Sequence, residues 1–333
     1  MSSKTEIGAA GVKVLPSRTY ALREPQSIGE FQLEKIIGRG STGTIFLGSS
    51  AQGEMSTPAA VKVFHVFGEG IDPQREMILH RYVSEPQSPH IIQFLADGIG
   101  QINDRRYTRR FPFLVTEFAE GGNLRTVLMN QGKIPVENAI DVTEQTASGL
   151  TIVHLSGLAH GDVKPENVLL ASQSNLQRTV PRVKVADFGA ARFMREGKSP
   201  YIDLSAGYTP PEQLFGYYLP EGDQFSLAAV FAEMVGGESL LPRKDKIVYW
   251  NSLTAPTYLE DVSESIKRTV PEPFQNTIRT ALSWEPEDRF ESAATFVMNL
   301  RNNYANATEE QLKTPVTVID LANRPVLLGV GGN

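Results

Sequence analysis

The sequence of 333 residues predicts an α+β protein with two lobes: a small antiparallel β-sheet with one main helix, then a larger, mainly helical part. Two observations lead to this fold class. Up to about residue 120, short β-branched and apolar runs alternate with segments rich in Gly, Ser and Pro, as in antiparallel strands. After Gly121 and Gly122, apolar residues recur at three- and four-residue intervals, which indicates helices.

The first lobe is expected to contain strands at residues 31–37, 44–48 and 59–65, then one helix at 73–83, then strands at 91–96 and 112–118. Asp72 is suited to cap the helix because its carboxylate can accept from the first free N–H groups. Pro73 suits the first helical position, where no N–H is needed. These elements define an N-lobe over residues 28–118.

The second lobe, over residues 119–303, is expected to contain five helices and two short strands. The helices are predicted at 123–130, 136–155, 223–235, 273–282 and 291–303, and the strands at 168–170 and 183–185. Residues 1–27 lack a sustained apolar period and are interpreted as an N-terminal tail. Residues 304–333 form a C-terminal extension with strand-like runs at 316–321 and 326–330.

Composition excludes several classes of function. A net charge of −6 and a pI near 5.5 argue against a broad basic surface for nucleic acid or anionic lipid. The absence of cysteine excludes disulfides and thiolate metal sites. The longest apolar run is nine residues, and Ser2 stands where myristoylation requires glycine. We expect a soluble cytoplasmic protein that neither inserts into membranes nor binds nucleic acid; a secreted effector would share these features, and the oligomeric state stays unknown.

A glycine motif, Gly38-x-Gly40-x-x-Gly43, precedes a β-branched segment that begins at Thr44. Such glycines let backbone N–H groups approach a phosphate closely. A dinucleotide-binding turn would continue into a helix, whereas this one continues into a strand. The motif is therefore either a flap over a nucleotide or a plain hairpin turn.

Lys62 lies within an apolar strand, which is a rare position for lysine. It is either an edge residue that reaches solvent or a cation for phosphate oxygens, held by a carboxylate of the next helix. Glu76 is the natural partner because it borders the apolar face of that helix; Glu69 is the less suitable alternative.

The densest polar cluster is the segment at residues 160–167. In it Asp162, Lys164 and Asn167 can converge on one point and supply a base, a phosphate cation and a metal ligand. Asp187 projects a second carboxylate from the end of a strand. Without a catalytic role, the segment at residues 160–167 would be a solvated loop, and Asp187 would belong to an ordinary turn, because Asp and Gly both favour turns.

Taken in order, these motifs resemble the protein kinase family. The matching residues are the glycine motif followed by Ile45, Ala60-Val61-Lys62, Glu76, His160-Gly161-Asp162 through Asn167, Asp187-Phe188-Gly189 and Pro210-Pro211-Glu212. Two further residues match: Asp223, which is expected to open a helix, and Arg289, which corresponds to the arginine that pairs with the glutamate of Pro-Pro-Glu. The resemblance covers residues 28–303, which implies a two-lobed protein kinase domain.

The resemblance implies a serine/threonine kinase that transfers the γ-phosphate of ATP to protein hydroxyls with Mg²⁺ or Mn²⁺. Lys62, held by Glu76, would contact the α- and β-phosphates; Asp162 would accept the hydroxyl proton and Lys164 would steady the γ-phosphate. Asn167 and Asp187 would bind the metal. The remaining nucleotide-binding residues would be Ile37, Gly38, Gly40, Gly43, Ile45, Ala60, Thr116, Glu117, Ala119, Asn123 and Leu169. The alternatives are a pseudokinase or scaffold that binds nucleotide and a partner protein, and a small-molecule kinase.

Two departures from the family pattern bear on regulation. Gly161 stands where many regulated kinases have an arginine that pairs with a phosphorylated activation segment. We therefore hypothesise that phosphorylation of Ser199, Tyr201, Ser205 or Thr209 is not the main on-switch. Ser205 fits the position of the family's activation-segment threonine. The interval of 14 residues from Lys62 to Glu76 is short for the family, which suggests a trimmed helix start.

Overall fold

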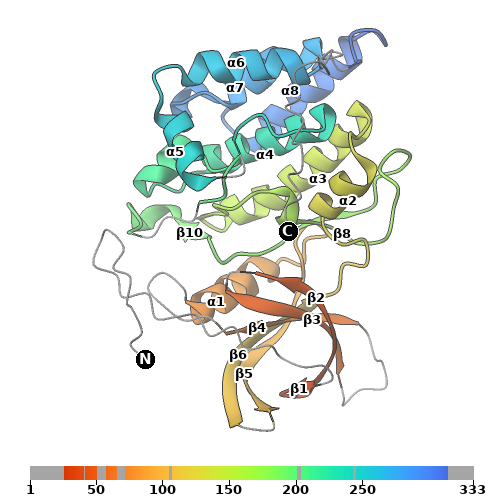
Figure 1. Cartoon of the computed structure of the whole chain (residues 1–333), viewed down its shortest axis with the longest axis vertical. Coiled ribbons are helices and arrows are strands. Elements are labelled where there is room, and N and C mark those ends of the chain that lie inside the picture. The colour runs from red at the N-terminus through yellow and green to blue at the C-terminus, as the bar shows by residue number, and fades with distance from the viewer. Residues whose placement is uncertain are drawn as a thin grey trace, which may run out of the picture.

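The computed structural model describes residues 26–40, 42–50, 58–65, 72–104, 107–200, 204–242 and 245–313. The tail up to residue 25, Glu69, Tyr201 and the strand-like runs at 316–321 and 326–330 lie outside these ranges. The described chain forms two lobes, a β-sheet lobe and a helical lobe (Figure 1). The predicted fold class is thereby confirmed.

The first lobe is built on an antiparallel sheet of six strands in the order β1-β2-β3-β4-β6-β5. The strands are β1 (Gln26–Ile28), β2 (Phe31–Arg39), β3 (Gly43–Ser50), β4 (Ala59–Phe64), β5 (Phe94–Asp104) and β6 (Tyr107–Glu117). β1 extends into the segment predicted as a tail, because Ile28 is fully buried in the lobe's core. The glycine motif joins β2 to β3, as the strand–strand interpretation requires.

The long hairpin of β5 and β6 differs from the two short strands that were predicted. β5 begins at Phe94 rather than at residue 91 and continues to Asp104. Gly98 and Gly100 lie inside β5 and are sites of close packing: a Cβ on Gly100 would lie 2.3 Å from Cγ1 of Ile28. Glycine in this strand therefore marks close approach of a neighbour rather than a turn.

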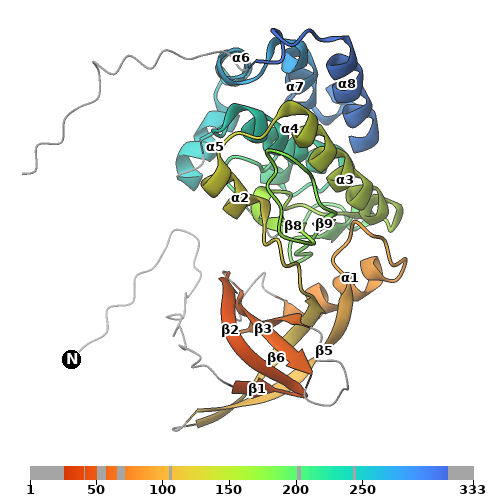
Figure 2. The same cartoon turned by 90° about the vertical axis from the view of Figure 1, so that its right-hand side faces the viewer.

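Helix α1 (Pro73–Ser84) packs beside β5 and β6 at the boundary with the second lobe (Figure 2). As predicted, the Asp72 carboxylate caps it, accepting from the backbone N–H groups of Gln74 and Arg75 at 3.0 and 3.2 Å. Only three helical residues precede Glu76, so the helix start is short.

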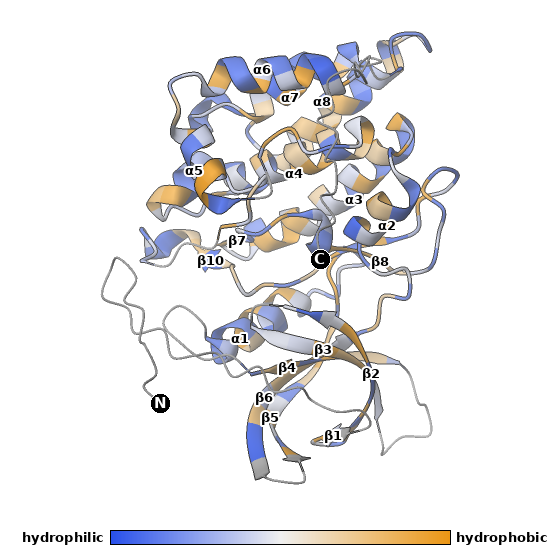
Figure 3. Cartoon of the chain, in the orientation of Figure 1, coloured by the Kyte–Doolittle hydropathy of each residue, from blue (hydrophilic) through white to orange (hydrophobic). Residues whose placement is uncertain are grey.

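The second lobe surrounds α4 (Pro220–Gly236), in which every residue from Gly222 onward is buried. Around it lie α2 (Leu124–Gln131), α3 (Val136–Leu155), α5 (Lys246–Thr254), α6 (Tyr258–Thr269), α7 (Gln275–Ala281) and α8 (Ala293–Asn306). Figure 3 shows apolar residues along α4 and polar residues on the outer face of α6. The core is therefore centred on one helix that is buried on all sides.

Several predicted boundaries in this lobe differ from the structure. α4 starts three residues before Asp223, α7 is preceded by a 3-10 turn at Glu272–Phe274, and the expected domain end at 303 falls inside α8. α5 and α6 were not predicted, although Tyr258, Val262 and Ile266, the buried apolar residues of α6, are spaced four residues apart. That spacing was a readable helical signal.

Two small antiparallel strand pairs position the polar segments between the lobes. β7 (Leu158–Ala159) pairs with β10 (Arg192–Phe193), and β8 (Val168–Leu170) pairs with β9 (Val183–Val185). Residues 160–167 join β7 to β8, and residues 187–189 follow β9; because Val168 at the start of β8 pairs with Val185 at the end of β9, the two segments meet at that end of the strand pair. Among the described residues, no helix has the length and apolarity that crossing a bilayer requires.

Candidate active site

Lys62 and Glu76 form an ion pair between the sheet and α1. Nζ of Lys62 lies 2.5 Å from Oε1 of Glu76 and 3.5 Å from Oδ1 of Asp187, and the two paired side chains are 13% and 5% exposed. Burial opposes the charge of Lys62, but the carboxylates of Asp187 and Glu76 outweigh it and raise the Lys62 pKa. The structure thus decides between the two interpretations of Lys62: it faces carboxylates, not bulk solvent.

Burial raises the pKa of Glu76 to about 7, although Lys62 acts in the opposite direction. Gly189 allows the close approach of this carboxylate, because a Cβ there would lie 3.0 Å from Oε2 of Glu76. A glycine after Phe188 therefore leaves room for the carboxylates of Glu76 and Asp187.

Asp187 faces the same point from the end of β9. It has a positive φ of 65°, and its Oδ1 accepts from the backbone N–H of Gly189 at 3.2 Å. Desolvation opposes its ionisation, but Lys62 and the Gly189 N–H outweigh that effect and lower its pKa to about 2. The side chain is 45% exposed, so it is an ionised carboxylate with room for a further ligand.

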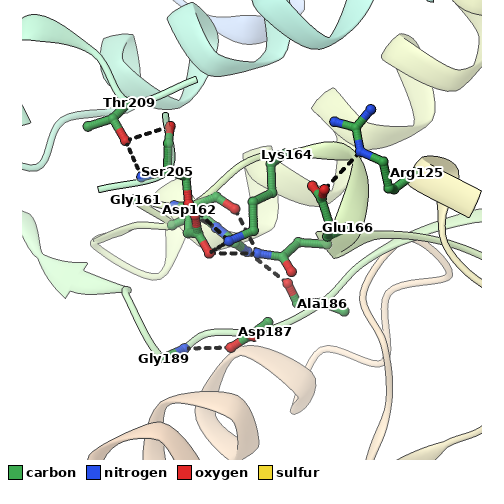
Figure 4. A network of polar contacts seen from close by, with 12 residues as sticks. Arg125, Gly161, Asp162, Lys164, Glu166, Ala186, Asp187, Gly189, Ser205 and Thr209 are labelled. Carbon is green, nitrogen blue, oxygen red and sulfur yellow. Dashed lines mark hydrogen bonds and ion pairs between the residues drawn. The ribbon is translucent and has the colours of Figure 1, made fainter. Parts of the chain in front are cut away.

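Asp162 is the centre of the polar loop (Figure 4). Its Oδ2 accepts from Nζ of Lys164 at 2.6 Å and from Nδ2 of Asn167 at 2.9 Å, and its Oδ1 accepts from Oγ of Ser205 at 2.6 Å. Lys164 also donates to Oγ of Ser205 at 3.0 Å. The three loop residues that were predicted to converge do so, and Ser205 of the activation segment joins them.

Asp223 holds the backbone at the start of the loop of residues 160–167 in place. Its two carboxylate oxygens accept from the backbone N–H groups of His160 and Gly161, both at 2.8 Å, and Nε2 of His154 donates to it at 2.8 Å. Burial raises the Asp223 pKa, but these donors outweigh burial and hold it below its ordinary value. Asp223 was expected to open a helix; it lies inside the first turn of α4 and acts as a scaffold for the loop.

Gly161 is required by the backbone and by its surroundings. It has a φ of 73°, a left-handed conformation that favours glycine. A Cβ at this position would lie 2.6 Å from Cδ1 of Tyr218. The arginine found here in many regulated kinases has no space in this chain.

A row of buried rings links α1 to the polar loop. The ring of Phe188 lies 5.0 Å from that of His80 and 5.3 Å from that of His160. His80 donates through Nε2 to the backbone oxygen of Ile92 at 3.0 Å. Sequence reasoning missed His80, although its spacing of four residues from Glu76 places both on one face of α1.

The expected adenine-pocket residues lie on β2, β3, β4, β6, β8 and the segment after β6. In the sheet register Ile45 lies opposite Lys62, and Ala60 lies opposite Thr116. Gly40 donates to the backbone oxygen of Gly43 at 2.9 Å, which closes the glycine turn.

Some polar groups of the segment after β6 already have hydrogen-bond partners within the protein. The backbone N–H of Glu117 already donates to the oxygen of Gln93, so a purine could use only its carbonyl. The carbonyl of Ala119 accepts from Gly122. The side chain of Asn123 caps α2 by accepting from the N–H of Thr126 at 2.9 Å, which restricts its freedom to reach a ribose.

The donor atoms present suit a hard divalent cation. Asp187 supplies an ionised carboxylate and Asn167 an amide oxygen, and the described residues contain no group of three or more His, Asp or Glu side chains that could hold a metal alone. Mg²⁺ commonly takes one or two protein carboxylates and completes its coordination with phosphates and water. The residues therefore fit a metal that arrives with a phosphate ligand.

A buried ion pair stabilises the helical lobe near this site. Arg289 donates from Nη1 and Nη2 to the two oxygens of Glu212, both at 2.8 Å. This is the pairing that the resemblance to protein kinases implies for these two residues, and its bidentate form fixes the position of the segment after Ser205.

The sequence is similar to a protein family and to individual proteins of that family. The model of the family described as protein kinase domain matches residues 31–300. The chain is 27% identical over 292 residues to the serine/threonine-protein kinase PknL of Mycobacterium bovis, covering 86% of this chain and 67% of PknL. It is 28% identical over 219 residues to PknA of Mycobacterium tuberculosis, covering 63% of this chain and 47% of PknA.

The fold has solved counterparts. The crystal structure of the Mycobacterium tuberculosis PknI kinase domain aligns with a TM-score of 0.63 at 20% identity, covering 86% of this chain and all of that domain. At this level of identity the match concerns the fold alone. It identifies the two-lobed arrangement as a protein kinase fold.

Proposed function

The chain belongs to the protein kinase family, and we propose that it transfers the γ-phosphate of ATP to serine and threonine hydroxyls of proteins. The observation that carries the proposal is the convergence on Asp162 of Lys164, Asn167 and Ser205. Facing it are Lys62, Glu76 and Asp187, so that no residue type expected for the transfer is replaced.

Asp162 acts as the proton acceptor for the substrate hydroxyl. As the hydroxyl oxygen forms its bond to the γ-phosphorus, the bond from that phosphorus to the oxygen of ADP breaks and the proton passes to Asp162. Ser205, Lys164 and Asn167 orient the carboxylate through hydrogen bonds, which holds it in one position for the transfer. Lys164 also offers its charge to the transferring phosphoryl group.

Lys62, oriented by Glu76, neutralises the α- and β-phosphate oxygens, and the glycine turn covers the phosphates with backbone N–H groups. Asp187 and Asn167 would hold a divalent metal ion, for which we propose Mg²⁺; it would neutralise part of the negative charge of the phosphate oxygens. Ile37, Ile45, Ala60 and Leu169 contact the base on its two faces. Thr116, Glu117, Ala119 and Asn123 line the edge of the base and the ribose.

We assign the phosphate transfer to the domain expected at residues 28–303. The structure extends this domain slightly at both ends, because β1 begins at Gln26 and α8 ends at Asn306. A pseudokinase commonly lacks one of the lysine, aspartate or metal-ligand positions, and this chain retains each of them, which favours the active enzyme.

The test is transfer of labelled γ-phosphate with Mg²⁺, to a generic protein and to the chain itself. Wild type is compared with Asp162→Asn and Asp187→Asn, and nucleotide binding is followed separately by the shift in melting temperature. We expect label on serine or threonine in wild type only. Nucleotide binding without transfer, under conditions in which a related kinase is active, would instead support the scaffold.

A further inference from the structure

Arg125 of α2 lies in a cluster of charged side chains outside the transfer residues. Its Nε donates to Oε1 of Glu166 at 2.8 Å, and its Nη1 donates to Oε1 of Glu233 at 2.6 Å. Its Nη2 contacts Oε2 of Glu233 at 3.2 Å and the hydroxyl of Tyr208. Three of its nitrogens are thus engaged with two carboxylates and a phenol from three other parts of the chain.

The cluster is a formed guanidinium site rather than a chance surface contact. Arg125 and Glu233 have side chains that are only 13% and 5% exposed, and the hydroxyl of Tyr208 also donates to Glu233 at 2.5 Å. Glu166 differs from them, because its side chain is 42% exposed. Two carboxylates therefore bind one guanidinium, and one of the two remains accessible from outside.

The accessible carboxylate lies close to the place of phosphate transfer. Glu166 immediately precedes Asn167, whose amide donates to Asp162, and Figure 4 shows Arg125 and Glu166 beside the Asp162 cluster. Adjacent Cα atoms are about 3.8 Å apart, and an extended peptide advances about 3.3 Å per residue. A side chain about two or three residues from an accepted hydroxyl could therefore reach Glu166.

We propose that Arg125 is a specificity-determining residue: its guanidinium fills the cation site formed by Glu166 and Glu233, so the protein does not select substrates with an arginine near the accepted hydroxyl. The inference rests on the proposed protein kinase activity. Because Glu166 and Glu233 already bind the guanidinium of Arg125, a guanidinium is the chemical group that we expect this site to bind in a substrate. Without the Arg125 side chain, the site would accept an arginine of a substrate.

The test compares kcat/KM for neutral serine peptides in which a single arginine is placed at each position on either side of the serine. In wild type we expect arginine to change kcat/KM by less than about threefold at every position, and Glu166→Gln to leave this pattern unchanged. In Arg125→Ala we expect a preference of about tenfold for arginine at one position, the size of a charge-assisted hydrogen bond. Adding Glu166→Gln to Arg125→Ala should remove that preference.

Arg178→Ala is the matched control, because it removes the same charge from an exposed position. If Arg125→Ala does not fold, Arg125→Gln takes its place, since glutamine keeps an amide donor for Glu233. The inference is overturned if wild type prefers arginine at some position and Glu166→Gln abolishes that preference, or if a folded Arg125 variant gains none. Absence of transfer to any peptide would contradict the proposed function instead.

Discussion

The hydroxyl of Ser205 donates a hydrogen bond of 2.6 Å to Asp162, a residue 43 positions earlier in the chain. Through this contact the activation segment takes part in orienting the proposed base. The same hydroxyl accepts from Lys164 at 3.0 Å, so Ser205 links the two charged residues of the loop.

Ser205→Ala is expected to lower kcat by about one to two orders of magnitude, because a hydrogen bond to a charged group contributes about 1.5–3 kcal/mol. Ser205→Thr should retain most of the activity, since threonine keeps the hydroxyl. Steady-state kinetics of both variants checks this prediction. Equal activity of the alanine and threonine variants would show that the hydroxyl does not orient Asp162.

Glu76→Gln is expected to lower kcat/KM for ATP by about tenfold or more, because Lys62 loses its charged partner and is left with Asp187, 3.5 Å away. The lysine would then shift toward the proposed metal ligand. Glu264→Gln is a suitable control, because Glu264 forms an exposed ion pair with Lys267 remote from this site. A Glu76→Gln protein as active as this control would contradict the positioning role of Glu76.

The stability of the protein is expected to depend on pH through His80. Burial is the main cause that lowers the His80 pKa to about 4, although Ile92 and Asp187 act against it. Below pH 6.5 the unfolded chain gains a proton at this position that the folded chain does not take up. His80 therefore contributes stability that is lost as the pH falls from about 6.5 to about 4, in total about 3 kcal/mol.

Urea denaturation of wild type and His80→Gln at pH 7.5 and pH 4.5 tests this contribution. Glutamine can keep the hydrogen bond to Ile92 but does not titrate. Glu76 also titrates in this pH range: its raised pKa stabilises the folded state as the pH falls. Both proteins contain Glu76, so the difference between their free energies of unfolding isolates the contribution of His80. From pH 7.5 to pH 4.5 we expect wild type to lose more of its free energy of unfolding than His80→Gln does. An equal loss in the two proteins would rule out the role of His80.

Phosphatase treatment is expected to change the transfer rate by less than about twofold. Gly161 has no room for the arginine that would read a phosphorylated segment, and Ser205 is bonded to Asp162. Thr209 is buried and bonds through Oγ1 to the backbone of Ser205. Mass spectrometry of the treated protein verifies that phosphate was removed; a large loss of activity would contradict the hypothesis drawn from Gly161.

Glu212→Gln is expected to lower the free energy of unfolding by about 3 kcal/mol, because it leaves the fully buried Arg289 without a carboxylate. Glu310→Gln serves as the comparison, since Glu310 pairs with Lys313 on the surface and should cost less than about 1 kcal/mol. Denaturation in urea measures both values. Similar losses for the two variants would show that burial does not determine the contribution of the pair.

The sequence by itself determined which residues carry the chemistry and in what order they occur. Asp162, Lys164 and Asn167 stand within six residues of one another, so their convergence depends on local chain geometry and could be predicted. The helix cap at Asp72 and the paired strands around Lys62 are likewise local, because caps and strand periodicity are read from neighbouring residues.

Apart from Glu212 and Arg289, whose pairing the resemblance to protein kinases implies, the tertiary structure decided which distant groups meet. Lys62 and Asp187 are 125 residues apart, and Arg125 and Glu233 are 108 apart, so no local pattern relates them. Gly161 appeared to be the loss of an arginine, and only the ring of Tyr218 shows that the position excludes a side chain. The physical reason is that propensity and periodicity act over a few residues, whereas packing and charge pairing join residues irrespective of their separation in the chain.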